Sequence, residues 1–180
     1  KIYRPYISLE KANLVFETPN SDQLEMTQRL IDLGWNSKQS NLASYFVTSD
    51  LSNDSLDEVK RGIQAAEEYL GPYGPMRVYI IGSDTSATDE AIEDFCTWAY
   101  DPEYMERCRN DQGVGIYEMA YYKGSNAFAQ HSRHTSIPNQ SFVIGNPLNM
   151  NMGYGSKIAA HEYIHIYQNA HQLYGESDVF

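Results

Sequence analysis

The strongest constraint on the fold is a helical pattern that leads almost directly into a buried strand. Apolar residues recur at helical spacing at Leu56, Val59, Ile63, Ala66 and Leu70. Ser55 and Glu58 match the capping box that begins a helix, and the Gly-Pro pair at 71–72 matches a helix end. The run MRVYIIGS at 76–83 then predicts a buried strand. A helix joined to such a strand indicates an α+β unit, in which helices pack against a sheet.

Further elements are predicted along the chain, with no internal repeat and no low-complexity linker between them. Strands are predicted at 12–19, 43–49, 114–122, 126–130 and 141–146. Helices are predicted at 21–34 and at 156–175, where Ser156 is the expected N-terminal cap. A chain of 180 residues with 42% hydrophobic content is long enough to bury one core. We therefore expect a single domain over residues 1–180.

The charge balance excludes several classes of partner. The chain has 24 acidic and 13 basic residues, which gives a formal net charge of −11. Nucleic acids and anionic membrane surfaces both require a basic protein surface, so we expect neither as a partner. The sequence also has no run of about 18 apolar residues, and we therefore expect no membrane span.

Two cysteines, Cys96 and Cys108, lie twelve positions apart in a segment that predicts a helix, a corner and a short helix. Pro102 can start the second helical turn, which would bring both sulfur atoms within bridging distance. A disulfide is therefore feasible, with two buried thiols in a reducing compartment as the alternative. The acidic composition, the many tyrosines, the few lysines and the feasible disulfide favour an extracellular or secreted protein. A sequence that begins at Lys1 without methionine fits a mature secreted product or a trimmed fragment.

The predicted helix at 156–175 concentrates histidines in a chain that has only five. His161 and His165 are four residues apart, which on a helix is a rotation of about 40° and a rise of about 6 Å. Both imidazoles therefore project from one face, at the separation that a tetrahedral zinc ion requires. Glu162 is placed to act as general base on a metal-bound water, which is the chemistry of amide hydrolysis.

The apolar residues of this helix predict how it packs. One stripe at helical spacing consists of Ala160, Ile164, Tyr167, Ala170 and Tyr174. The two histidines lie at the edge of that stripe, so a metal would sit between the packed face and solvent. Tyr163 is interpreted as a packing residue. The alternative is a surface helix with two incidental histidines and no metal.

The motif HEYIH at 161–165 resembles the active-site helix of the zincin metallopeptidases. In the thermolysin-like branch, the gluzincins, an edge strand that contains Asn-Ala-Phe precedes this helix and pairs with the substrate backbone. The segment SNAFAQ at 125–130 is similar to that strand, with an ordinary strand as the alternative. The resemblance implies that Asn126 and Ala127 bind an extended peptide. It also implies a zinc metalloendopeptidase with Zn²⁺ as cofactor, a peptide or protein as substrate, and a mixed twisted sheet packed on helices.

A zinc site needs a third protein ligand, and His171 is the first candidate. It stands ten positions after His161, which is the spacing of the metzincin branch. That branch has a glycine where this chain has Gln168, and the glycine lets the backbone turn the third histidine towards the metal. If the helix continues, His171 points away from the other pair. Asn169 could instead end the helix and allow His171 to bind.

Two alternatives for the third ligand remain open. Glu176 and Asp178 follow the predicted helix, although a gluzincin glutamate normally comes from a further helix. The last alternative is a ligand beyond Phe180, and we favour this one. Residues 1–180 would then be a single zincin-like catalytic lobe that lacks the C-terminal lobe. A second interpretation of the function is a catalytically incomplete, zincin-derived module for binding or assembly.

Overall fold

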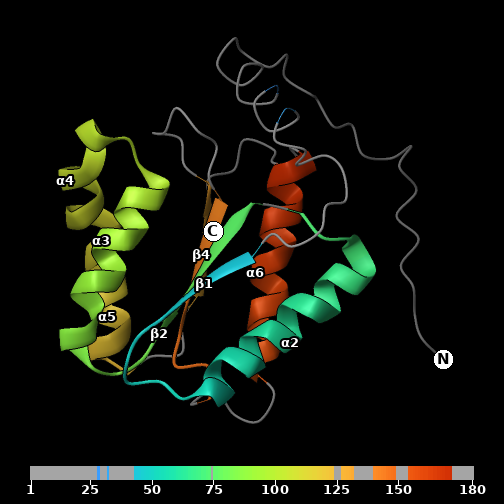
Figure 1. The fold of residues 1–180 in the computed structure, drawn as a ribbon, viewed down its shortest axis with the longest axis horizontal. Coiled ribbons are helices and arrows are strands. Elements are labelled where there is room, and N and C mark those ends of the chain that lie inside the picture. Colours follow the sequence, from blue (N-terminus) through green and yellow to red (C-terminus); the bar gives the residue numbers. More distant parts are fainter. Residues whose placement is uncertain are drawn as a thin grey trace, which may run out of the picture.

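A mixed four-stranded sheet forms the centre of the computed structural model (Figure 1). The structure describes residues 43–73, 75–123, 127–131, 140–148 and 154–171, together with Gln28 and Asp32. Its strands are β1 (Ala43–Val47), β2 (Met76–Ile81), β3 (Ala127–His131) and β4 (Gln140–Gly145), in the order β1-β2-β4-β3. The first two strands and β4 run parallel, and β3 pairs antiparallel with β4 at one end of this order. The α+β class and four of the predicted strands are confirmed.

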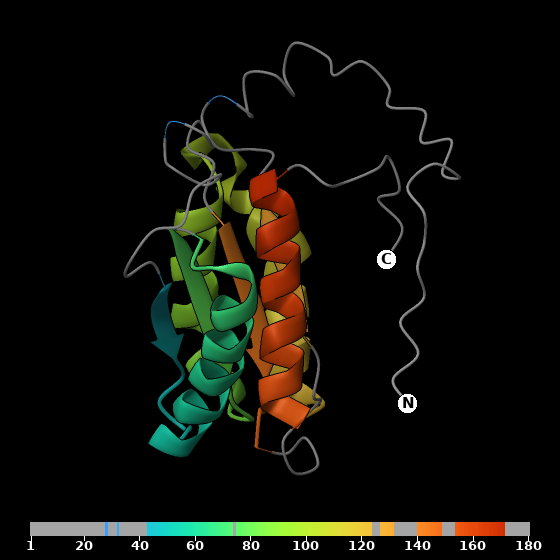
Figure 2. The ribbon, with the colours of Figure 1, turned by 90° about the vertical axis from the view of Figure 1, so that its right-hand side faces the viewer.

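Helices cover both faces of the sheet (Figures 1 and 2). One face carries α2 (Asn53–Leu70) and α6 (Tyr154–His171), which lie side by side. The other face carries α3 (Thr88–Ala99), α4 (Met105–Cys108) and α5 (Val114–Tyr121). Short turns of 3₁₀ helix occupy Thr85–Ala87 and Pro102–Tyr104, and a π turn occupies Arg109–Gly113. The strand predicted at 12–19 lies outside the described residues, and of the helix predicted at 21–34 only Gln28 and Asp32 are described, both helical.

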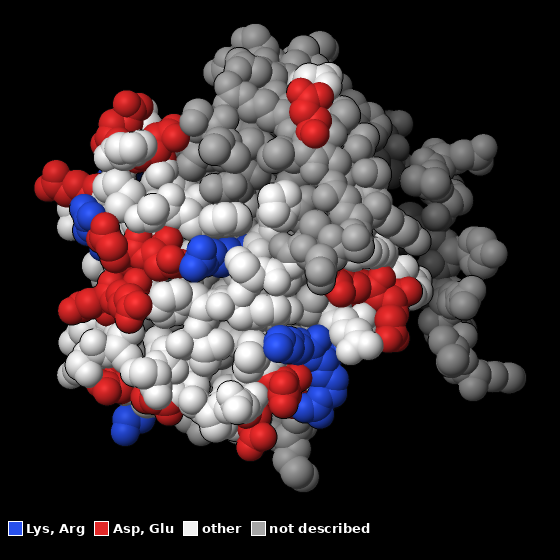
Figure 3. Space-filling model, viewed as in Figure 1, with Lys and Arg blue, Asp and Glu red and all other residues white. Residues whose placement is uncertain are grey.

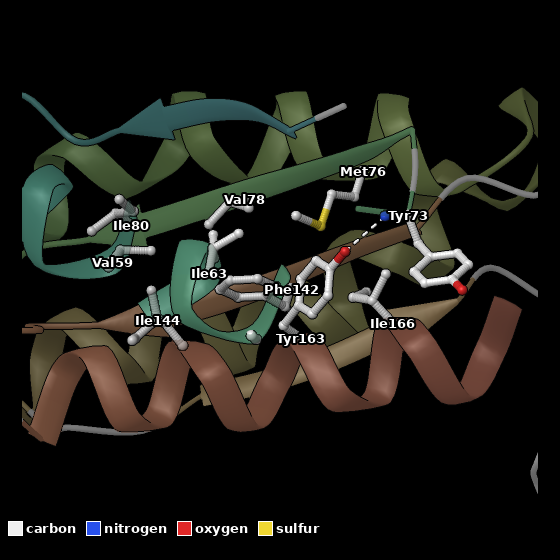
Figure 4. Close-up of a cluster of buried hydrophobic side chains, with 12 residues drawn as sticks. Val59, Ile63, Tyr73, Met76, Val78, Ile80, Phe142, Ile144, Tyr163 and Ile166 are labelled. Atoms are coloured by element: carbon white, nitrogen blue, oxygen red, sulfur yellow. Dashed lines mark hydrogen bonds between the residues drawn. The ribbon is translucent and has the colours of Figure 1, made fainter. Parts of the chain in front are cut away.

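Alternate residues of the strands supply two separate hydrophobic clusters, because successive side chains of a strand point to opposite faces. Val78, Ile80, Phe142 and Ile144 pack against α2 and α6 (Figure 4). Tyr79, Ile81 and Val143 pack against α3 and α5 on the other face. The parallel inner strands are covered on both faces, which explains why residues 78–81 of β2 and 142–144 of β4 read as continuous apolar runs.

The segment 114–122 is a helix, so the strand predicted there is wrong. Its aromatic and β-branched residues favour a strand by composition. However, Ile116, Met119 and Ala120 are buried against the sheet at helical spacing. Tyr117 and Tyr121, which lie four positions apart, face solvent. The partners on the sheet therefore select the helical period over the local strand preference.

Two predicted helix caps are also wrong. The N-cap of α2 is Ser52, and Ser55 lies buried inside the helix. The carboxylate of Glu58 does not return to its own helix start; it accepts a hydrogen bond from the backbone N–H of Ser156, at 2.9 Å, and pairs with Arg61 at 2.8 Å. Ser156 is itself two residues inside α6, which begins at Tyr154. Glu58 thus satisfies a backbone donor in the first turn of the neighbouring helix, where such donors have no partner within their own helix.

Cys96 and Cys108 form a disulfide. This confirms the predicted bridge over the alternative of two buried thiols. It joins α3 to α4 with a Cα–Cα distance of 5.7 Å, and both cysteines are buried. The chain turns between them at Pro102, where the 3₁₀ turn begins, as the sequence predicts. A disulfide is compatible with an oxidising compartment, and an extracellular location stays a prediction.

Acidic side chains dominate the layer formed by α3, α4 and α5 (Figure 3). Some of them form ion pairs on the surface, such as Glu93 with Arg109 at 2.8 Å and Asp111 with Arg107 at 3.4 Å. Such exposed pairs contribute about 0–1 kcal/mol to stability. Within the described residues, none of the helices combines the length and apolar character needed to cross a membrane.

Candidate functional site

The orientation of α6 is set by its buried face. Ala159, Tyr163 and Ile166 are fully buried against α2 and the sheet, whereas Ile164 is 43% exposed. The predicted stripe is therefore wrong at Ile164, and Ala160 and Tyr167 pack against the core only partly buried. The fully buried residues precede these three by one position, which is a rotation of about 100°. The side chain of Ala170 and the whole of Tyr174 lie outside the described residues. Both sets have the same spacing, so periodicity alone cannot distinguish them. The partners of the helix decide which set is buried.

Tyr163 holds this orientation through its hydroxyl group (Figure 4). The hydroxyl donates a hydrogen bond to the carbonyl oxygen of Gly71, at 2.8 Å, and accepts one from the backbone N–H of Tyr73, at 2.7 Å. Both partners belong to the connection between α2 and β2. Burial raises the pKa of Tyr163 well above its usual range. Its interpretation as a packing residue is confirmed, and its position in the middle of the HEYIH motif anchors that motif to the core.

The two histidines lie side by side on the side of α6 away from Tyr163. The centroids of the His161 and His165 rings are 4.9 Å apart, and the ring planes cross at 88°. His161 is exposed and His165 is partly buried. A zinc–nitrogen bond is about 2.0–2.1 Å long and the ring centroid lies about 1 Å further on, so two tetrahedral imidazole ligands have centroids about 5 Å apart. The pair therefore fits zinc in spacing.

Glu162 points towards the sheet. The residue is 6% exposed, and its carboxylate accepts a hydrogen bond from the backbone N–H of Ala129 in β3. Burial raises the pKa of Glu162, while the nearby His165 and the Ala129 N–H lower it in part. The candidate base thus lies between the histidine pair and the strand at the end of the sheet. Sequence reasoning did not find Ala129, because nothing local links it to a residue 33 positions later.

Gln168, which stands where metzincins have a glycine, is a further residue of the site that the sequence did not predict. Its side-chain oxygen Oε1 lies 3.0 Å from Nδ1 of His165. The spacing of three residues on one helix is the signal that could have found this contact, because such residues are neighbours on a helix surface.

The remaining predicted residues are placed only in part. Ala127 begins β3 opposite Ile144, and its side chain packs on the same face as α6. Asn126, Glu176 and Asp178 lie outside the described residues. His171 is the last residue of α6, and its side chain is not described. In a continuous helix its Cα lies about 9 Å along the axis beyond that of His165, so metal binding by His171 would require this turn to unwind.

In the described part of the chain the two imidazoles lie side by side on α6, and the carboxylate of Glu162 lies near enough to His165 to interact with its charge. Within that part, three or more His, Cys, Asp or Glu side chains do not gather into a group that could hold a metal ion. Comparisons with protein-family models, with curated proteins and with solved structures found no match to this chain.

Proposed function

We propose that this protein is a zinc-dependent metallopeptidase, in which His161 and His165 bind zinc and Glu162 is the general base. The observation that carries the proposal is the position of the three side chains. Two imidazoles lie at the spacing of a shared tetrahedral ion, and the carboxylate that follows the first of them is turned towards a strand at the end of the sheet. Zinc, when bound there, supplies Lewis acidity that polarises a peptide carbonyl and lowers the pKa of a water molecule.

The protein groups then divide the remaining work. Glu162 takes the proton from the attacking water and holds it for the leaving amine. The backbone N–H of Ala129 stabilises the charged form of that carboxylate. Since Glu162 is nearly buried, its proton transfers take place in a site that contains little water.

Strand β3 is the proposed support for the substrate. It runs antiparallel to β4 at the end of the strand order, and its residues Ala127 and Ala129 face α6. An extended peptide that adds to such a strand passes beside the helix that carries the histidines. This arrangement agrees with the zincin resemblance, in which Asn126 and Ala127 hydrogen-bond to the substrate. The third zinc ligand is proposed to lie outside the described residues.

The variant Glu162→Gln tests this function. The amide keeps the size of the carboxylate and cannot accept a proton, so zinc content should be unchanged while peptide cleavage falls by about 10²-fold or more. Glu118→Gln, on the exposed surface of α5, is the matched control and should retain full cleavage. The measurements are zinc content by elemental analysis and hydrolysis of a fluorogenic peptide library. Full activity of Glu162→Gln would end the proposal.

A second candidate function follows from the same geometry. Among the side chains that the structure describes, the imidazoles of His161 and His165 lie together without a third metal-binding group, which favours a zincin-derived module for binding or assembly without catalysis. Equilibrium dialysis with zinc separates the two candidates, because two histidines alone hold the ion weakly. Tight binding of one zinc per chain places the third ligand within residues 1–180 and supports the enzyme, whereas weak binding without peptide cleavage supports the incomplete module.

A further inference from the structure

The contact between Gln168 and His165 joins a side-chain amide to one of the two ring nitrogens of the histidine. Nδ1 of His165 lies 3.0 Å from Oε1 of Gln168, which is a hydrogen-bond distance. In this arrangement the amide oxygen Oε1 faces the ring, and because an amide oxygen can only accept a hydrogen bond, the geometry points to Nδ1 as the donor. In the neutral imidazole the lone pair then resides on Nε2, the nitrogen at the far end of the ring.

Zinc binding requires a neutral imidazole with a lone pair directed at the ion. A hydrogen bond from the other ring nitrogen is the usual means of selecting the tautomer and the ring orientation. Here the acceptor is supplied from the next turn of the same helix and is itself partly buried. Both residues of the contact therefore belong to one helix.

We propose that Gln168 is the positioning residue of His165: it holds the Nδ1–H tautomer and turns Nε2 towards the ring of His161. This inference deepens the proposed zinc site and rests on it for its functional meaning. Gln168 stands where metzincins have a glycine, and in this proposal it has a role that a glycine could not fill. Gln168 does not touch the metal; it acts through the ligand that it orients.

The test compares three variants of the 180-residue chain. Gln168→Met removes the acceptor at similar size, and Gln168→Glu keeps an acceptor at the same place. Gln64→Met is the control, because Gln64 also bonds within its helix, to Glu68 at 3.3 Å on the exposed face of α2. Each protein is examined without metal by ¹⁵N NMR of the imidazole rings at about pH 8, where histidine is neutral. Zinc affinity is then measured by competition with a chelating dye.

We expect the Nδ1–H form of His165 in the wild type, in Gln168→Glu and in Gln64→Met. In Gln168→Met the ring should shift towards the Nε2–H form, and zinc affinity should fall by about 10–100-fold. Gln168→Glu keeps the hydrogen-bond acceptor and should retain the zinc affinity of the wild type. A purely structural role for Gln168 would not predict this difference between the two variants. An Nε2–H ring in the wild type, or an unchanged tautomer in Gln168→Met, would overturn the inference.

The two proposals fail in different ways. If the wild-type chain binds no zinc, the proposed function fails, while the metal-free NMR spectra still decide the role of Gln168. If the wild type binds zinc and Gln168→Met binds it equally well, the function stands and the positioning role is lost.

Discussion

Replacement of Tyr163 by phenylalanine is the sharpest test of how α6 is held on the core. The substitution removes one hydroxyl oxygen and keeps the ring, which is fully buried among Val78, Phe142 and Ile166 and their neighbours (Figure 4). The hydrophobic contribution should therefore change little. Any loss of stability reports on the two hydrogen bonds of the hydroxyl group.

The expected magnitude follows from those two bonds. The carbonyl oxygen of Gly71 loses its donor at 2.8 Å, and the backbone N–H of Tyr73 loses its acceptor at 2.7 Å. A buried group that loses its partner costs about 1–3 kcal/mol, since water cannot replace the bond. The free energy of unfolding of Tyr163→Phe should thus fall by about 2–6 kcal/mol. For a chain of this size that corresponds to a melting temperature about 4–24 °C lower.

Urea unfolding followed by circular dichroism measures the difference, with the slope expected to stay unchanged because the folded surface is the same. Tyr69→Phe is the matched control, because Tyr69 is 89% exposed and should change stability by less than about 0.5 kcal/mol. If Tyr163→Phe were as stable as this control, the hydroxyl group would not anchor α6, and the reasoning on its orientation would be refuted.

Two further predictions concern the contact between α2 and α6. A Cβ atom at Gly62 would overlap the carbonyl oxygen of Ser156, so Gly62→Ala should cost about 1–3 kcal/mol in unfolding free energy. Gly115→Ala, which meets nothing within 4 Å, should instead gain about 0.5–1 kcal/mol, and equal gains at both sites would contradict the close helix contact. The hydrogen bond from the N–H of Ser156 lowers the pKa of Glu58 in the folded protein. The stability that Glu58 contributes should therefore be complete above its unfolded pKa of about 4.3. It should be lost as the pH falls through the lower, folded pKa. The unfolding free energies of the wild type and Glu58→Gln should therefore differ at neutral pH and converge in acid; a constant difference across the pH range would argue against this role.

Local physics explains the parts of the fold that sequence reasoning predicted. The strands predicted at 76–83 and 141–146 are mostly apolar because a sheet covered on both faces buries nearly all of the residues of its inner strands. The helix that ends at Gly71 could be predicted from its spacing and from the glycine, which adopts a φ of 98° there. The juxtaposition of His161 and His165 also follows from sequence alone, because residues four apart on any helix are neighbours.

Only the tertiary structure decided the features that depend on contacts between distant segments. Composition favoured a strand at 114–122, and the sheet selected a helix. Spacing allowed two phases for α6, and the bonds of Tyr163 to the end of α2 selected the one that buries Ala159 rather than Ala160. The carboxylate of Glu162 accepts a hydrogen bond from the backbone of Ala129. The carboxylate of Glu58 accepts one from the backbone of Ser156, which is 98 positions away in the sequence. A short sequence pattern determines whether a segment has the period of a helix or a strand, and which of its residues are neighbours. Which side of that helix or strand faces the core depends on its packing and hydrogen-bond partners. Only the folded chain supplies those partners.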